Sequence, residues 1–155
     1  MAAEPERGAR VIVCAVDGSS AHESAVEVAT QLAVLAKARL ALFAVAPVPS
    51  RDTSEFASPG WTLEEAMRAL ELTAAALDNR VGVDWYLDAG NPVRRLIEFA
   101  ARTRALLLVV GTSAPSSDRP PSMVASGLTR GAPCPVVVVP EGATLPELDN
   151  TTPQR

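Results

Sequence analysis

Short runs made only of apolar residues constrain the fold of this chain more than any other feature of its sequence. Such runs occur at residues 11–16 (VIVCAV), 40–45 (LALFAV), 105–110 (ALLLVV) and 136–139 (VVVV). A strand without polar positions must be covered on both faces, as strands inside a parallel α/β sheet are. These runs therefore predict the strands of one parallel sheet.

The segments between these runs have helical periodicity. Apolar residues recur at helical spacing in 25–36, 63–77 and 93–100, and a short helix is predicted over 122–131. Residues 81–87 alternate apolar and polar side chains, which predicts one more strand near a sheet edge. Strands that alternate with helices predict an α/β fold: an open five-stranded parallel sheet with helices on both faces.

Length and charge narrow the class of protein further. The 155 residues suit one domain, which we expect at 10–140, after a disordered leader at 1–9 and before a flexible tail at 141–155. The first residues form no apolar segment, so they are expected to be neither a signal peptide nor a membrane span, and the protein is expected to be cytoplasmic. A net charge of −4 without a basic cluster argues against nucleic acids and anionic membranes as partners.

Few residues in the chain could support catalysis or metal binding. With His22 as its single histidine, the sequence offers no zinc-type site, and we expect His22 in a solvated position of the first helical turn. Cys14 and Cys134 are expected to be buried thiols rather than a disulfide. Because no triad or acid/base pair can be assembled, the sequence does not predict an enzyme.

The first strand ends in a turn that could contact a ligand. Asp17 and Gly18 follow the strand, and Ser20 with Glu23 has the spacing of a capping box at a helix start. Open parallel sheets bind ligands at the carboxyl ends of their strands, so Asp17 is the first candidate for ligand contact. The alternative is an aspartate that only forms the turn beside Gly18. Ser19 and Ser20 are expected to be caps, because no base is positioned to activate them.

Four stretches together carry a family resemblance: VDGSSAHESAVEVATQLA at 16–33, the turn at 90–92, LLLVVGT at 106–112 and APCPVVVV at 132–139. In this order and spacing they resemble a universal stress protein domain that covers residues 11–139. The resemblance implies the adenine nucleotide alpha hydrolase-like fold, a homodimer and, in one branch of the family, bound ATP or AMP.

The resemblance also implies where a nucleotide would lie. It assigns nucleoside contacts to Asp17, the adenine side to Ala15 and Val16, and base packing to Val45 at the end of the second strand. The phosphates would meet a glycine loop after the fourth strand, patterned G-x2-G-x9-G-[ST], of which Gly111 is the first glycine. The remaining candidate residues, at the loop and at its two ends, are Val110, Ala114, Ser122, Met123 and Val124.

The loop departs from this pattern after its first glycine. Ala114 stands at the second glycine position, and Ser122 with Met123 stands where the pattern has G-[ST]. Pro120 and Pro121 precede this pair, and neither proline has the amide donor that a phosphate cradle needs. We therefore expect a regulatory or binding module of the stress response rather than a tight ATP binder. The alternative is an ATP- or AMP-binding protein with a modified phosphate loop and slow hydrolysis.

The last strand suggests a partner. In this fold it lies at a sheet edge, where an uncovered row of four valines promotes aggregation. The resemblance implies that Val136, Val137, Val138 and Val139 pair antiparallel with a second copy, and the alternative is that the C-terminal tail covers them. A further protein partner is also expected.

Two other classes share the strand alternation. A phosphoacceptor receiver domain needs an acidic pair after strand one and a lysine after the last strand, and this chain has neither. A flavodoxin-like flavin binder needs a phosphate loop of hydroxyl and glycine residues after strand one, which is also missing.

Overall fold

The computed structural model describes residues 5–19, 21–46, 62–113 and 123–146. Strands and helices alternate strictly along this part of the chain, as the sequence predicts. The strands are β1 (Val11–Ala15), β2 (Arg39–Ala46), β3 (Val83–Ala89), β4 (Leu107–Thr112) and β5 (Val136–Pro140). The helices are α1 (Ala21–Ala36), α2 (Leu63–Leu77), α3 (Pro92–Thr103) and α4 (Met123–Gly131).

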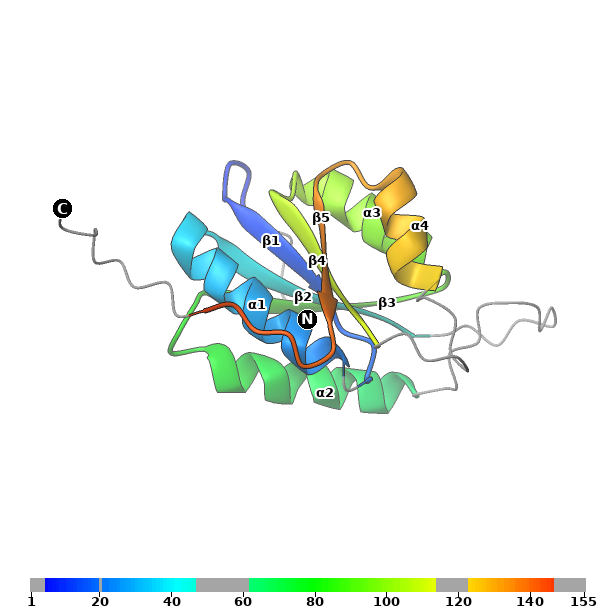
Figure 1. The fold of residues 1–155 in the computed structure, drawn as a ribbon, viewed down its shortest axis with the longest axis horizontal. Coiled ribbons are helices and arrows are strands. Elements are labelled where there is room, and N and C mark those ends of the chain that lie inside the picture. The colour runs from blue at the N-terminus through cyan, green and yellow to red at the C-terminus, as the bar shows by residue number, and fades with distance from the viewer. Residues whose placement is uncertain (1–4, 20, 47–61, 114–122, 147–155) are drawn as a thin grey trace, which may run out of the picture.

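The five strands form one parallel sheet in the order β3-β2-β1-β4-β5. The chain adds β2 and β3 on one side of β1 and β4 and β5 on the other, so β1 lies at the centre and β3 and β5 are the edge strands. The predicted fold class is therefore confirmed, and so is the edge position predicted for the alternating strand. Figure 1 shows α1 and α2 on one side of the sheet and α3 and α4 on the other.

The alternate side chains of β1 supply both halves of the core. Ile12 and Cys14 pack on the side of α1 and α2, whereas Val11 and Val13 pack on the side of α3 and α4. All of these side chains are at most 1% exposed, which explains why the strand has no polar position. On the second side, Phe99 stacks against two aromatic rings, Phe43 at 4.5 Å and Tyr86 at 4.8 Å between ring centroids.

Helix capping moves two strand starts relative to the predicted ranges. The Val81 amide still donates to Leu77 at the end of α2, so β3 begins at Val83 rather than at residue 81. The Ala105 amide donates to Ala100 at the end of α3, so β4 begins at Leu107 rather than at residue 105. The predicted apolar runs thus include residues that close the preceding helix.

Side-chain caps fix two of the helix starts. The Thr62 hydroxyl accepts from the Glu65 amide, and the Glu65 carboxylate accepts from the Thr62 amide, a reciprocal capping box at α2 that the sequence analysis missed. At α3, Asn91 caps the Arg94 amide, and Pro92 occupies the first turn, where its missing amide hydrogen costs no helix hydrogen bond. The capping box predicted at Ser20 lies outside the described residues.

The chain after β5 turns back toward α1. The Glu141 amide donates to the Thr112 carbonyl at 2.8 Å, and the Gly142 amide donates to the Ser24 hydroxyl at 2.8 Å. Ala143 and Leu145 pack against the core on the α1 side. The segment predicted to be a tail therefore begins with residues that contact the domain, and residues 147–155 lie outside the described part. None of the helices in the described ranges is both long and apolar enough to cross a membrane.

Candidate functional site at the carboxyl end of the sheet

The central strands bring three of the predicted site residues together at the carboxyl end of the sheet. β1 lies between β2 and β4, and the Val16 amide donates to the Phe43 carbonyl at 2.8 Å, which continues the pairing just past β1. Asp17, Val45 and Gly111 follow or end β1, β2 and β4, so they lie at the carboxyl ends of neighbouring parallel strands. Open parallel sheets bind small ligands at this end of their strands.

Asp17 forms the turn between β1 and α1. Its Oδ1 accepts from the Ser19 amide at 2.9 Å and from the Ser19 hydroxyl at 2.6 Å, and Gly18 adopts a positive φ of 78° beside it. This is the turn-forming role considered as an alternative for Asp17. The side chain is nevertheless 62% exposed, so the same carboxylate also remains open to a ligand.

His22 does not occupy the solvated position expected from the sequence; that expectation was wrong. Its side chain is only 16% exposed, and Nδ1 lies 4.0 Å from Oδ1 of Asp17. Among the described residues, Nδ1 is buried without a hydrogen-bond partner. The first turn of α1 therefore places an imidazole beside Asp17, a proximity that helical spacing alone did not reveal.

Cys14, three residues before Asp17, has an unreactive thiol. Its side chain is completely buried, and burial, with a smaller contribution from the charge of Asp17, raises the pKa of the thiol far above its ordinary value. Burial also raises the pKa of Cys134, which is only half-buried. Both thiols are free. Cys14 is buried as predicted, but Cys134 is only half-buried, so the burial expected of Cys134 was wrong.

Gly111 has a packing role that is independent of any ligand. A Cβ at this position would lie 2.4 Å from the carbonyl oxygen of Ala21 and 2.8 Å from its carbonyl carbon. The end of β4 therefore approaches the first turn of α1 so closely that only glycine fits without a shift. The glycine that the family pattern assigns to the phosphates is thus also required by the strand–helix contact.

The other predicted site residues differ in their exposure. Ala15 and Val16 are 8% and 2% exposed, and they point to opposite faces of the sheet. Val45 and Val124 are half-buried and pack, together with buried Val110, on the α3 and α4 side. Met123 begins α4, whereas Ala114 and Ser122 lie outside the described residues. The structure therefore brings the nucleoside half of the implied site together and leaves the phosphate loop undescribed.

Two arginines near this end of the sheet are engaged with a neighbouring carboxylate. Arg94 and Arg95, at the start of α3, contact the two carboxylate oxygens of Glu98 at 3.1 and 3.3 Å. Arg95 also donates to the Ala89 carbonyl at 3.0 Å. A phosphate would have to compete with these contacts. Within the described ranges, no group of three or more histidine, cysteine or acidic side chains could hold a metal ion.

The sheet order and the turn after β1 define an open α/β protein whose central strands end side by side at the carboxyl end of the sheet. More specifically, the chain belongs to the universal stress protein family, whose sequence model matches residues 8–140. No curated protein sequence matches it significantly.

Several solved structures of universal stress proteins are similar to this chain. A universal stress protein family member from Burkholderia pseudomallei is 29% identical, with a TM-score of 0.65 over 88% of this chain and 99% of the other. A universal stress protein in complex with cAMP is 21% identical, with a TM-score of 0.62 over 84% and 96% of the two chains. A family member from Arabidopsis thaliana with AMP bound is 21% identical, with a TM-score of 0.59 over 86% and 93%.

Proposed function

We propose that this protein is a dimeric regulatory binding module that retains the nucleoside half of a nucleotide site but does not hold ATP tightly. The observation that carries the proposal is the position of Asp17, exposed at the carboxyl end of the central strand, beside the ends of β2 and β4. Within this edge, Val45 offers an apolar surface to a base, and Asp17 offers a carboxylate that can accept hydroxyl hydrogens from a ribose.

The phosphate side has weaker physical support. A triphosphate needs several amide donors or unpaired cations. The sequence that follows Gly111 supplies prolines at 115, 120 and 121, and Arg94 and Arg95 are already paired with Glu98. This combination favours a ligand with little phosphate charge over ATP.

A second candidate function is binding of a nucleoside monophosphate. It is favoured by the family members crystallised with cAMP, AMP and dAMP. In this case the single phosphate would lie near the start of α4, where helix amides attract anions.

Isothermal titration calorimetry separates these functions. We expect adenosine and AMP to bind more tightly than ATP with Mg²⁺, and Asp17→Ala to weaken their binding about tenfold, whereas Glu23→Ala, which changes a carboxylate in the first turn of α1, does not. Micromolar binding of ATP would contradict the proposal. If neither adenosine nor AMP binds, the nucleoside half is not functional.

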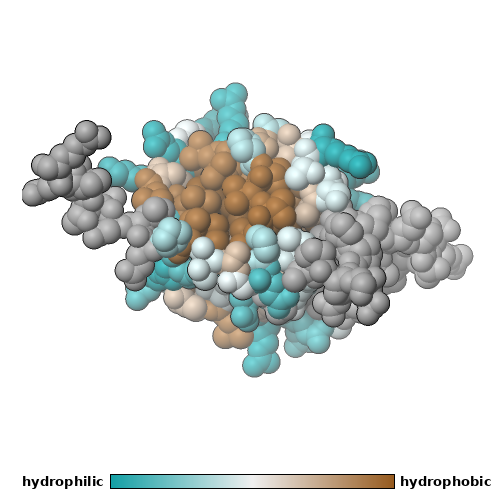
Figure 2. Space-filling view, in the orientation of Figure 1, coloured by the Kyte–Doolittle hydropathy of each residue, from teal (hydrophilic) through white to brown (hydrophobic). Residues whose placement is uncertain are grey.

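The proposed homodimer uses the open edge of β5. The Leu108 amide donates to the Pro135 carbonyl and the Glu141 amide to the Thr112 carbonyl, so the odd-numbered residues of this segment face β4. The backbone groups of Val136 and Val138 therefore point to the open edge, and Pro140 there has no donor. Val138 is 37% exposed, and Figure 2 shows a continuous apolar surface over the region that β5 occupies in Figure 1. An edge of this kind is suited to pairing with a second copy.

Sedimentation of a Val138→Lys variant tests this assembly. We expect the variant to be monomeric at concentrations where the unchanged protein is dimeric, because a lysine would place a charge in the apolar centre of the contact. Leu72→Lys is the matched control, since Leu72 is 63% exposed on α2, away from β5. A Val138→Lys variant that remains dimeric would contradict the proposed β5 contact.

A further inference from the structure

We propose that Asp88, at the end of β3, is a specificity-determining residue of the candidate site, and that its carboxylate accepts a hydrogen bond from the exocyclic amine of a bound purine base. This inference rests on the proposed nucleoside site, to which it adds the carboxyl end of a further strand. It names the chemical feature that the site selects: an amino group on the base, as adenine has.

Asp88 lies in one row across the sheet with Val45 and Asp17. Val45 on β2 is paired in register with Asp88 on β3. On the other side of β2, the Val16 amide donates to the Phe43 carbonyl at 2.8 Å, which continues the pairing with β1 past the end of that strand. By this register, Asp17 comes level with Val45. Neighbouring strands lie about 4.8 Å apart, so the backbones of the two aspartates are roughly 10 Å apart, with Val45 between them.

Val45 and Asp88 also point to the same side of the sheet. The paired residues Phe43 and Tyr86, two positions earlier on the same strands, both belong to the core on the α3 and α4 side. Because side chains alternate along a strand, Val45 and Asp88 point to that side too, and Val45 packs there. A base that lies on Val45 therefore has one of its edges beside Asp88.

Among the described residues, one oxygen of Asp88 remains available to such a base. Oδ1 accepts from the Ala89 amide at 2.8 Å, whereas Oδ2 lies 3.9 Å from Nε of Arg95, beyond hydrogen-bond distance. The Arg95 guanidinium is held by other partners, since Nε donates to the Ala89 carbonyl at 3.0 Å and Nη1 to Glu98 at 3.3 Å. The side chain of Asp88 is 38% exposed, so a ligand can reach it. One available oxygen suits a single N–H donor such as an amine.

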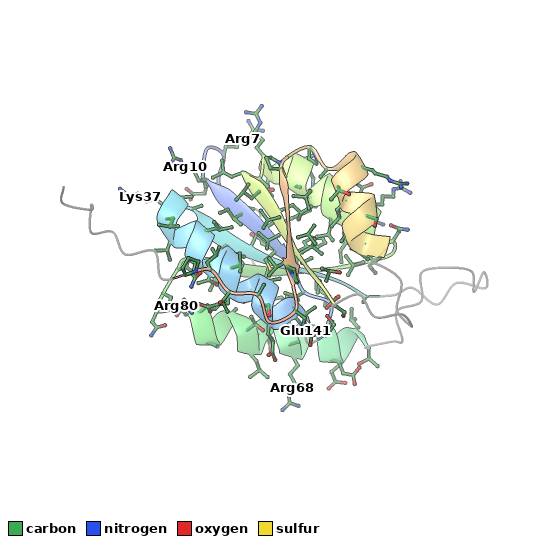
Figure 3. All side chains as sticks on the ribbon, in the orientation of Figure 1. Arg7, Arg10, Lys37, Arg68, Arg80 and Glu141 are labelled. Carbon is green, nitrogen blue, oxygen red and sulfur yellow. The ribbon has the colours of Figure 1, made fainter. Side chains whose placement is uncertain are left out.

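The charges of this row also favour a nucleoside over a phosphate-rich ligand. With the carboxylates of Asp17 and Asp88 at its two ends, the row accepts hydroxyl and amine hydrogens, whereas a phosphate placed there would meet like charges. Figure 3 shows Arg7, Arg10 and Lys37 at the amino end of the sheet, so the length of the strands separates these cations from the two carboxylates. A nucleoside whose ribose lies at Asp17 and whose amine lies at Asp88 matches the row at both ends.

Isothermal titration calorimetry with two nucleosides tests this contact on the unchanged protein. Purine riboside differs from adenosine only in lacking the exocyclic amine. We expect adenosine to bind about tenfold more tightly, because the hydrogen bond to the carboxylate is lost with the amine. In Asp88→Ala, both nucleosides should bind with nearly the same affinity. Asp84→Ala is the matched control, since it removes an aspartate from the amino end of the same strand and the same side of the sheet, and it should keep the tenfold preference.

The outcomes separate this inference from the proposed nucleoside site. Asp17→Ala should weaken both nucleosides by the same factor and keep the preference, because Asp17 faces the ribose. Equal binding of adenosine and purine riboside to the unchanged protein would overturn the role of Asp88 and leave the nucleoside site standing. An Asp88→Ala variant that keeps the tenfold preference would do the same. If neither nucleoside binds, the nucleoside site and the role of Asp88 are both overturned.

Discussion

At the scale of single residues, Gly111 joins a packing constraint to a binding motif. We expect Gly111→Ala to lower the free energy of unfolding by about 1–3 kcal/mol, because its Cβ would lie 2.4 Å from a backbone oxygen that cannot move independently. Urea denaturation measures the change. Gly82→Ala is the control. A Cβ at Gly82 would lie 2.7 Å from the end of the Arg39 side chain, which is flexible and can move away. Equal stability of the two variants would contradict the packing role.

The two thiols should differ in reactivity for the same local reasons. Cys14 is fully buried and Cys134 is half-buried, and burial raises the pKa of both thiols. Because the thiolate is the reactive form, we expect Ellman's reagent to modify Cys134 slowly in the folded protein and Cys14 only after unfolding. A Cys134→Ser variant should then show no reactive thiol until it is denatured; rapid reaction of Cys14 in the folded variant would disprove this.

At the scale of elements, α2 depends on its first turn. The capping box of Thr62 and Glu65 satisfies two backbone amides at its start, and α2 has no basic residue in its last turn. We expect Thr62→Ala to lower the free energy of unfolding by about 1 kcal/mol, measured by thermal or urea denaturation. Thr62→Ser keeps the hydroxyl oxygen and should cost much less. Equal losses in both variants would show that the hydroxyl does not cap the helix.

At the scale of the whole molecule, the ion pair between Arg80 and Glu27 joins distant segments. Arg80, after α2, donates to both oxygens of Glu27 in α1, at 3.0 and 2.9 Å. The hydrogen bond and, less strongly, the charge of Arg80 lower the pKa of Glu27 below its ordinary value of 4.5, against the opposing effect of burial. The stabilisation is therefore complete above that ordinary value and is lost as the pH falls through the lowered pKa.

Removal of Arg80 should show this pH dependence. Both side chains are more than two-fifths exposed, so solvent screens the pair, and we expect Arg80→Gln to cost about 0.5 kcal/mol at neutral pH and almost nothing below the pKa of Glu27. Urea midpoints measured across this pH range give the difference. Arg68→Gln is the control and should show no such trend; a constant difference for Arg80→Gln would contradict the pair.

The sequence by itself determined the architecture of this protein. Unbroken apolar runs such as 11–16 can be satisfied only when both faces of a strand are covered, and helical periodicity between them supplies the covering layers. Local patterns of this kind do not depend on where distant segments lie, so the class of fold, the alternation of elements and the position of Asp17 after β1 followed directly from them.

Only the tertiary structure decided how residues far apart in the chain meet. The contact of Gly111 with Ala21 and the hydrogen bond of Gly142 to Ser24 each join segments whose distance is set by the packing of α1 on β4 and β5. The helical pattern places His22 on a turn but does not say which neighbour covers that turn. The order of the strands in the sheet sets which elements lie beside that turn. It also brings the carboxyl ends of β1, β2 and β4 together, where a ligand could bind.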